Sequence, residues 1–325
     1  MSQVPHFVEA RQRKSPTYGR WARWQRRLRA SWRRFRADWR IFAQNRLAVA
    51  GLILILIYGL MSIAHPILRA TVWQEGIYNP VTGFDMQVMH PAPPSSRHLL
   101  GTDSLGRDVL SMLLAATTPT FLVGIAAALT TAFIGTTIGV VSAYRKGATD
   151  AILSHISDAF LLVPAPLFMV IVGMRFREIG PVPLGLIYGF IAGAGAAAIV
   201  MRAQAMQIVV KPFIDAARIA GGGSRRVMVV HVLPHMLPLT ALYMMLAVTG
   251  AVVADAFISF FGFSRDYLNW GTIIYSSFIY SSYLQSGVEW HVLLPPSMAL
   301  SIFAAAFYFV ARGLHEVADP RLRDR

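Results

Sequence analysis

Two histidines of this 325-residue chain stand at a spacing known from zinc sites. His231 and His235 are four positions apart, as zinc ligands on a helix often are. Pro234 lies between them and breaks regular helix geometry, and no third ligand lies nearby in the sequence. A turn or cap is therefore the better interpretation, and we predict no metal site.

A second polar group, Asp103, Arg107 and Asp108, has residue types that can serve acid–base chemistry. Gly101 and Gly106 flank these residues, a setting that favours a structured loop held by an Asp–Arg pair. The sequence also lacks the Ser, His and Asp order with a nucleophile elbow that acyl transfer requires. We therefore predict no catalytic residues and no enzyme activity.

The composition places most of the chain in a membrane. Hydrophobic residues make up 55% of the sequence and charged residues 14%, compared with about 25% charged in an average soluble domain. A soluble fold of this length could not hide so much apolar surface, and disordered segments are poor in apolar residues. The absence of cysteine excludes a disulfide scaffold and a thiol nucleophile.

Six largely apolar runs are long enough to cross a bilayer, so the predicted fold class is an all-α membrane protein with about six transmembrane helices. The runs are 47–64, 109–144, 151–174, 179–201, a span within 227–254, and 290–311. The second holds one long tilted helix, or a short interfacial piece ending near Pro119 and then a span. The fifth span is expected to begin after Pro234 and Pro238.

Two further runs have distinct compositions. The stretch 193–198 contains only glycine and alanine, which suits close helix packing in lipid. The run 267–288 is uncharged but crowded with Ser, Tyr, Asn and Gln, and we predict an interfacial or partly re-entrant segment there. Signal-peptide cleavage after Ala64 is not expected, because the basic region before this run is too long.

Positive charge is concentrated at the N-terminus. The net charge is +14, and residues 1–46 hold thirteen Lys and Arg against two acids. Under the positive-inside rule this segment is cytoplasmic, and six spans then place both termini in the cytoplasm. Aromatic and leucine residues recur along one helical face, which predicts a basic amphipathic helix in the headgroup layer. They are Trp21, Trp24, Leu28, Trp32, Phe35, Trp39 and Phe42.

Two acids lie within or beside the apolar runs, Asp158 in the third and Asp255 near the end of the fifth. An ionisable residue within a membrane span is a candidate functional residue. Either acid could face a solute pathway and meet a positively charged group, or could pair with an arginine for structure alone. The candidate arginines are Arg175, Arg202 and Arg265.

A short helix of about ten residues, 212–221, is predicted in the basic connection after the fourth span. Pro212 suits a first helical turn, Asp215 favours the positive N-terminal end, and Gly221 is a stop signal. Such a helix is too short to be stable alone in water, so it needs another surface to pack against.

This connection carries a recognisable motif. Asp215-Ala216-Ala217-x3-Gly221-x9-His231-x-Leu233-Pro234 resembles the EAA loop of ABC-importer permeases, with Asp215 where Glu is usual and His231 where Ile is common. The resemblance implies that the loop 206–234 forms a coupling helix that docks on an ATPase subunit. The implied coupling residues are Asp215, Ala216, Ala217, Arg218, Gly221, Leu233 and Pro234.

A second signature narrows the branch of the family. The segment 98–110 is similar to the LGTDxxGRD motif of peptide- and nickel-type permeases, carried here by Gly101, Thr102, Asp103, Gly106, Arg107 and Asp108. Further matches follow in the family's order. They are Tyr144-Arg145-Lys146-Gly147-x-x-Asp150, Phe260-Phe261-Gly262-Phe263, Trp270-Gly271 and Ala318-Asp319-Pro320-Arg321-Leu322. The resemblance is to the second, C-type permease of dipeptide and oligopeptide importers, and it favours a structural role for Asp255.

The resemblance implies a set of partners in the cytoplasmic (inner) membrane. These are a homologous permease in a heterodimer, two cytoplasmic ABC ATPases and an extracytoplasmic substrate-binding protein, together moving di- or oligopeptides by alternating access. No G-x-x-x-x-G-K-[ST] segment occurs, so ATP and Mg are expected in the partner subunits and no cofactor in this chain. Membrane lipid is an expected partner of the basic segment, and nucleic acid is not.

Two other function classes stay open at this point. One is an ion-coupled secondary transporter or channel that uses Asp158 and Asp255 as proton relays, and the other is a membrane scaffold with a basic arm. A secondary transporter has no use for a docking helix, so the loop separates the hypotheses. The expected divisions are 1–46 as the interfacial segment, 47–105 as the first span and external loop, 106–312 as a five-helix core, and 313–325 as a cytoplasmic tail.

Overall fold

The computed structural model describes residues 36, 39–176, 178–263, 267–284 and 289–318. The chain divides into two compact units, Met1–Ile41 and Phe42–Arg325. The fold described below is that of the second unit. Most of the predicted amphipathic N-terminal segment lies outside the described residues, as do Arg265 and all but the first residue of the motif at 318–322.

Five stretches of helix are long and apolar enough to cross a membrane, and a bent pair of helices makes a sixth. Three of the five are α2 (Arg46–Thr71), α4 (Val109–Arg145) and α13 (Trp290–Ala318). The fourth consists of α7 (Pro181–Ala192), η1 (Gly193–Ala197) and α8 (Ala198–Val209), and the fifth of α10 (Ser224–Val227), η2 (Met228–Val232) and α11 (Leu233–Phe260). The described residues contain no strand beyond one isolated bridge, so the predicted all-α membrane fold is confirmed.

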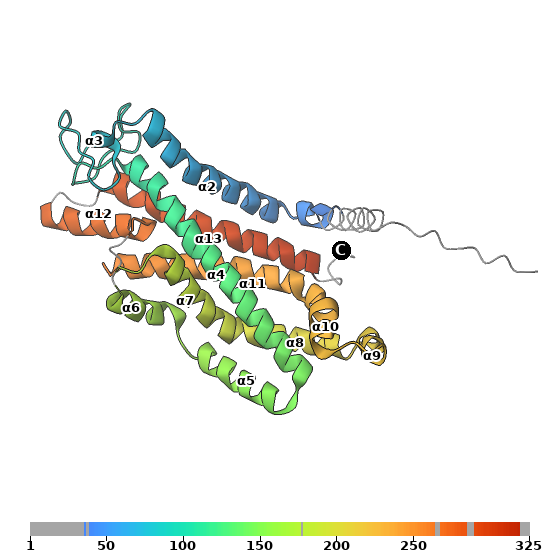
Figure 1. Cartoon of the computed structure of the whole chain (residues 1–325). Helices are drawn as coiled ribbons and strands as arrows, with labels where there is room; N and C mark the ends of the chain where they lie inside the picture. Colours follow the sequence, from blue (N-terminus) through green and yellow to red (C-terminus); the bar gives the residue numbers. More distant parts are fainter. Residues whose placement is uncertain (1–35, 37–38, 177, 264–266, 285–288, 319–325) are drawn as a thin grey trace, which may run out of the picture. The chain divides into compact units, whose positions relative to one another are not determined.

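The long helices run side by side, and the two ends of the bundle differ (Figure 1). At one end the small helix α3 (Glu75–Tyr78) lies within the loops that connect α2 to α4. At the other end lie α9 (Pro212–Ile219) and α10. The two segments that carry the sequence motifs are therefore at opposite ends of the bundle.

The third span is broken, unlike the continuous run expected at 151–174. It consists of α5 (Gly147–Leu161) and α6 (Ala165–Arg175), which are bent by 77° relative to each other. The break falls at Pro164, whose backbone is extended, with φ −70° and ψ 95°. The helix α5 ends at Leu161, and Pro164 is the N-cap of α6. A residue before proline is disfavoured in the α conformation, which keeps Val163 out of either helix.

The fifth span begins earlier than predicted, because Pro234 and Pro238 do not start the helix. Helical structure is continuous from Ser224, and the π-helical turn η2 leads directly into α11. Pro234 is the second residue of α11, which directly follows the π-helical turn. With this wider π-helical turn, the helical segment stays continuous past Pro234 and Pro238.

Glycines bring α4 and α7 into close contact. A Cβ atom on Gly185 would lie 2.3 Å from the carbonyl oxygen of Val123, and one on Gly189 would lie 2.5 Å from that of Ala127. Only glycine allows the two backbones to approach so closely. The glycine and alanine stretch at 193–198 continues this contact, and its π-helical form in η1 was not predicted.

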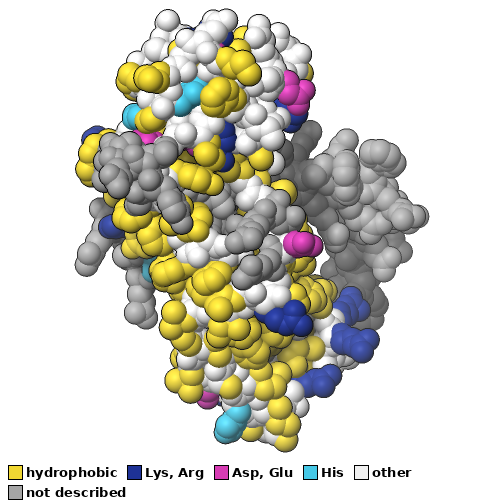
Figure 2. Space-filling view, turned by 90° about the vertical axis from the view of Figure 1, so that its left-hand side faces the viewer, with side chains coloured by type: hydrophobic (Ala, Val, Ile, Leu, Met, Phe, Trp, Pro, Cys, Tyr) yellow, Lys and Arg dark blue, Asp and Glu magenta, His cyan; other side chains and the backbone are white. Residues whose placement is uncertain are grey.

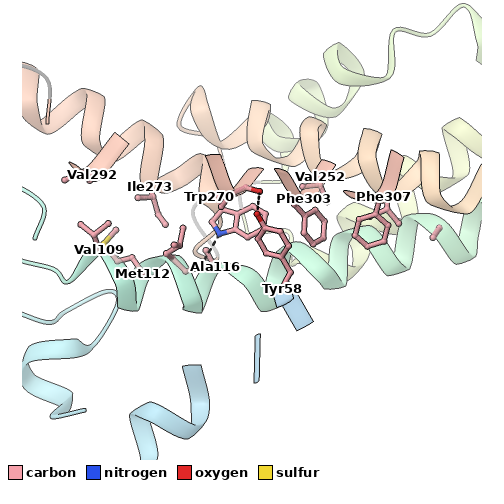
Figure 3. Close-up of a cluster of buried hydrophobic side chains, with 14 residues drawn as sticks. Tyr58, Val109, Met112, Ala116, Val252, Trp270, Ile273, Val292, Phe303 and Phe307 are labelled. Carbon is pink, nitrogen blue, oxygen red and sulfur yellow. Dashed lines mark hydrogen bonds between the residues drawn. The ribbon is translucent and has the colours of Figure 1, made fainter. Parts of the chain in front are cut away.

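The amphiphilic segment after the fifth span forms α12 (Trp270–Leu284), a 15-residue helix that is too short to be counted among the spans. Its first residue, Trp270, is fully buried and donates from Nε1 to the carbonyl oxygen of Leu113, 3.2 Å away. The Tyr58 hydroxyl donates to the carbonyl oxygen of Ala299 at 2.8 Å. Figure 3 shows Trp270, Tyr58 and Phe303 packed together at the centre of this apolar core.

The outer faces of the bundle are apolar. On α2, Leu56 is 60% and Leu60 67% exposed. Figure 2 shows hydrophobic side chains spread over much of another face of the molecule. Apolar side chains in this quantity suit contact with lipid rather than with water.

Candidate functional site

The helix α9 begins and ends as its local sequence dictates. Pro212 starts it and Asp215 lies in its first turn. At its end the N–H of Gly221 donates to the Arg218 carbonyl, and the N–H of Gly222 donates to the Ala217 carbonyl, each at 3.0 Å. This is a Schellman cap, and Gly221 adopts the φ of +82° that the cap requires. The cap ends the helix after eight residues, two fewer than predicted.

One face of α9 is anchored to the bundle. Ile214 is fully buried and belongs to an apolar cluster formed by the ends of α4, α8 and α11. Ala217, one turn further on, packs against the same cluster. The Arg218 guanidinium lies over the Tyr144 ring, 4.9 Å from its centroid. These contacts supply the external support that a two-turn helix needs.

The other face of α9 is exposed. Ile219 is 89% exposed and Phe213 39%, an unusual position for large apolar side chains at the end of a bundle. The exposed Asp215 carboxylate pairs with Arg218 at 3.2 Å, and Ala216 is exposed beside it. Asp215, Ala216 and Ile219 therefore lie on the exposed side of α9.

The two remaining motif residues, Leu233 and Pro234, lie in the first turn of α11 rather than on α9. The start of α11 contacts α9 through His235, which follows the motif. The centroid of the His235 ring lies 5.3 Å from that of the Phe213 ring. His235 is thus a packing partner of an aromatic ring. The described residues contain no group of three potential metal ligands.

A bidentate ion pair joins α8 to α5. Arg202 Nε lies 2.5 Å from one carboxylate oxygen of Asp150, and its NH2 nitrogen lies 2.6 Å from the other. Ser142 of α4 donates to the same carboxylate. Pairing of Arg202 with Asp158 was one of the sequence-based alternatives; the ion pair of Arg202 is with Asp150, although the charge of Asp158 also acts on Arg202. Asp158 is exposed on α5.

The second membrane acid, Asp255, is buried among neutral groups. The Tyr267 hydroxyl donates to its carboxylate at 2.5 Å, and Asn269 Nδ2 donates at 2.9 Å. Asn269 also donates to Ser259 at 2.7 Å. No described arginine pairs with Asp255, and this network ties α11 to the segment that leads into α12.

At the opposite end of the bundle, the motif between α2 and α4 folds around an ion pair. Arg107 Nε lies 2.8 Å from Asp103 Oδ2, and the backbone N–H of Arg107 donates to Oδ1 at 2.8 Å. Gly101 and Gly106 both have φ of +81°, a conformation that other residues adopt only at a cost. Thr102 accepts from the Ala92 N–H at 2.9 Å, which fixes the loop against its own earlier part.

Asp108 connects this loop to the first turn of α4. One oxygen caps the helix by accepting from the Ser111 N–H at 2.7 Å, and the other lies 2.8 Å from His98 Nδ1. His98 Nε2 in turn lies 3.2 Å from Asp85, which pairs with Arg97 at 2.6 Å. Asp85 was not among the predicted functional residues, because it belongs to no recognised motif.

Two opposing effects act on the Asp85 carboxyl. Burial raises its pKa, but hydrogen bonds from the Gln87 N–H and from His98, together with the Arg97 charge, outweigh burial. The net result is a pKa below the ordinary value of 3.8. The loop is thus held by a carboxylate that the surrounding donors keep ionised.

The fold and these sites define a multi-pass membrane protein with a supported two-turn helix at one end and a folded loop at the other. Residues 135–324 match the family described as the inner membrane component of binding-protein-dependent transport systems. This match covers more than half of the chain, and the chain belongs to that family. It is a membrane-embedded permease subunit of a binding-protein-dependent ABC importer, which works together with other subunits.

Individual relatives agree with this family. A protein of Brucella suis named as a peptide transport system permease is 29% identical over 71% of this chain and 76% of its own length. The oligopeptide transport system permease protein OppC of Haemophilus influenzae is 28% identical over 87% of each chain. OppC of Bacillus subtilis is 29% identical over 87% of this chain and 88% of its own length.

Proposed function

We propose that this chain moves di- or oligopeptides across the cytoplasmic membrane by ATP-driven alternating access, and that α9 is its docking element for the ATPase. The half-anchored state of α9 carries this proposal. Ile214 fixes the helix to the ends of α4, α8 and α11, while Phe213 and Ile219 offer apolar contacts outward. A force on the outer face would thus reach three of the long helices directly.

The remaining parts of the importer belong to other chains in this proposal. A homologous permease pairs with this chain, two ATPases bind ATP and Mg on the cytoplasmic side, and an extracytoplasmic protein delivers the substrate. The α9 end is then cytoplasmic, and so are both termini. Peptide as the substrate class is supported by the names of the relatives, which are peptide or oligopeptide permeases.

Ile219→Asp tests the docking role. A carboxylate at an 89% exposed position requires no repacking of the apolar core, but it places a charge on the apolar surface proposed to meet the ATPase. We expect loss of peptide uptake and loss of ATPase co-purification, with a normal amount of permease in the membrane. The matched control is Val72→Asp, also at an exposed position (69%) but between α2 and α3 at the opposite end of the bundle.

The two variants separate the possible outcomes. Full uptake and normal ATPase retention in Ile219→Asp would reject α9 as the docking element. Because the chain has no cysteine, Ile219→Cys provides a single labelling site, and ATPase subunits should shield it from thiol reagents in the assembled importer.

A further inference from the structure

The long helices α4 and α11, together with η2, enclose an apolar groove outside the α9 site. Its volume is about 430 Å³. The α4 wall is formed by Leu129, Ala132, Phe133, Thr136, Thr137, Val140 and Val141, and the other wall by Met228, Val229, Leu233, Leu237 and Thr240. Thr136 and Thr240 are buried and their hydroxyls are 3.0 Å apart, so they satisfy each other at the base of the groove.

The groove has the length of one membrane leaflet. From 129 to 141 on α4 the helix rises by about 18 Å, roughly half of a hydrocarbon core about 30 Å thick. Almost all of the groove's lining is apolar, and its two buried threonines satisfy each other, so it offers few polar groups to a peptide. An extended hydrocarbon chain fits these dimensions and this lining.

Basic residues stand at one end of both walls. On α4, Arg145 lies four residues beyond Val141 and so on the same helical face. On the other wall, Arg225 and Arg226 precede Met228 and Val229 by three residues each. Both positions belong to the end of the bundle that carries α9 (Figure 1).

These three arginines have no acidic counterpart in the described part of the chain. All three are exposed, and none forms an ion pair with a described acid. The groove is apolar, and guanidinium groups without an acidic partner lie at one end. A molecule with an acyl chain and an anionic phosphate head matches both features. Arginine binds phosphate through two parallel hydrogen bonds.

We propose that the groove between α4 and η2–α11 binds an anionic phospholipid. One acyl chain lies along the groove, and Arg145, Arg225 and Arg226 hold the phosphate at its end. Basic sites between transmembrane helices at the membrane surface are suited to such head groups. The site uses none of the exposed α9 residues, although Leu233 of the coupling motif lines it and Arg225 and Arg226 belong to the loop 206–234.

The experiment uses the complete importer in nanodiscs of neutral phosphatidylcholine, titrated with fluorescent phosphatidylglycerol. The charge variant is Arg145→Gln with Arg225→Gln and Arg226→Gln, and we expect affinity to fall by roughly fivefold for each charge removed. The matched control is Arg312→Gln, an exposed arginine near the end of α13 and outside the groove. It should leave phosphatidylglycerol binding unchanged.

A second variant tests the groove itself. Ala132→Trp fills the space with an indole and keeps every charge, so it should abolish saturable binding while the arginines remain. Equal phosphatidylglycerol binding by the wild type and both variants would overturn the proposal. So would equal binding of phosphatidylcholine and phosphatidylglycerol, or disulfide cross-linking of Val229→Cys to a partner permease, which would show a protein in the groove. Peptide uptake by the Ala132→Trp variant, which leaves the loop 206–234 unchanged, reports on the proposed function separately.

Discussion

Arg202 of α8 and Asp150 of α5 form a two-pronged ion pair, with nitrogen–oxygen distances of 2.5 and 2.6 Å. Only two residues separate the end of α8 at Val209 from the start of α9 at Pro212. The helix α5 is the first half of the bent third span. The pair therefore fixes α8, the helix that precedes α9, to the first half of the bent third span.

Asp150→Asn should destabilise the importer permease by about 2 kcal/mol, because it leaves a half-buried guanidinium without its charged partner. Thermal unfolding of the purified complex, followed by loss of monodisperse protein, measures this effect. The double variant Asp150→Arg with Arg202→Asp should recover part of the loss, since it restores opposite charges.

The Arg218–Asp215 pair is the matched control for this prediction. Its side chains are 40% and 61% exposed, so Asp215→Asn should cost less than about 1 kcal/mol. Equal destabilisation by Asp150→Asn and Asp215→Asn would show that burial of the first pair contributes nothing.

Gly221→Ala should weaken uptake, and Gly221→Pro should abolish it. The φ of +82° at Gly221 costs a residue with a Cβ atom about 1–2 kcal/mol, and proline cannot adopt it. Substitution therefore loosens the cap that ends α9. ATP-dependent uptake in membrane vesicles, normalised to the amount of permease, provides the measurement.

Gly223→Ala is the control for the cap. Gly223 has an ordinary φ of −62°, and an added Cβ atom would meet nothing within 4 Å. Its uptake should equal that of the wild type. If Gly221→Ala and Gly223→Ala behave alike, the cap geometry does not matter for transport.

Gly185→Ala should destabilise the bundle by about 1–3 kcal/mol, because the new methyl group would lie 2.3 Å from the Val123 carbonyl oxygen and force α4 away from α7. Gly59→Ala on α2 is the matched substitution, since nothing lies within 4 Å of its Cβ position. It should be neutral or slightly stabilising. The melting temperatures of the two variants test this difference in stability. Similar values for both would contradict close packing at Gly185.

The loop around Asp85 should lose stability only in strong acid. Because its pKa is lower in the folded protein than the ordinary 3.8, Asp85 contributes stability that is complete above that value. This contribution disappears as the pH falls through the lower, folded-state pKa. Hydrogen exchange of residues 85–108 should therefore be constant from neutral pH to about 5 and rise below 3.8, after correction for intrinsic exchange rates.

Asp85→Asn removes the titrating group, so its loop should lack this acid-dependent step. Glu75→Gln, an exposed member of the Arg69–Glu75 pair at the same end of the bundle, should retain it. An unchanged acid step in Asp85→Asn would assign the step to another carboxylate.

Much of the architecture follows from the sequence because it depends on local properties. Hydropathy over about 20 residues identifies a span wherever it packs, and six spans were predicted where the structure has five helices and a bent pair. Pro212 and Gly221 likewise delimit α9 through their own backbone preferences. The motif residues 101–108 were predicted to form a loop with an Asp–Arg pair, and Asp103 and Arg107 do form one.

Partners distant in sequence were decided by the tertiary structure alone. Asp150 and Arg202 are 52 positions apart, and nothing local distinguishes that pairing from one with Asp158. The same holds for Asp255 and its neutral neighbours, for His98 between two carboxylates, and for the groove that α4 forms with η2 and α11. The physical reason is that a side chain's partner depends on how helices pack, whereas the hydropathy of a span and the φ of a glycine belong to the segment itself.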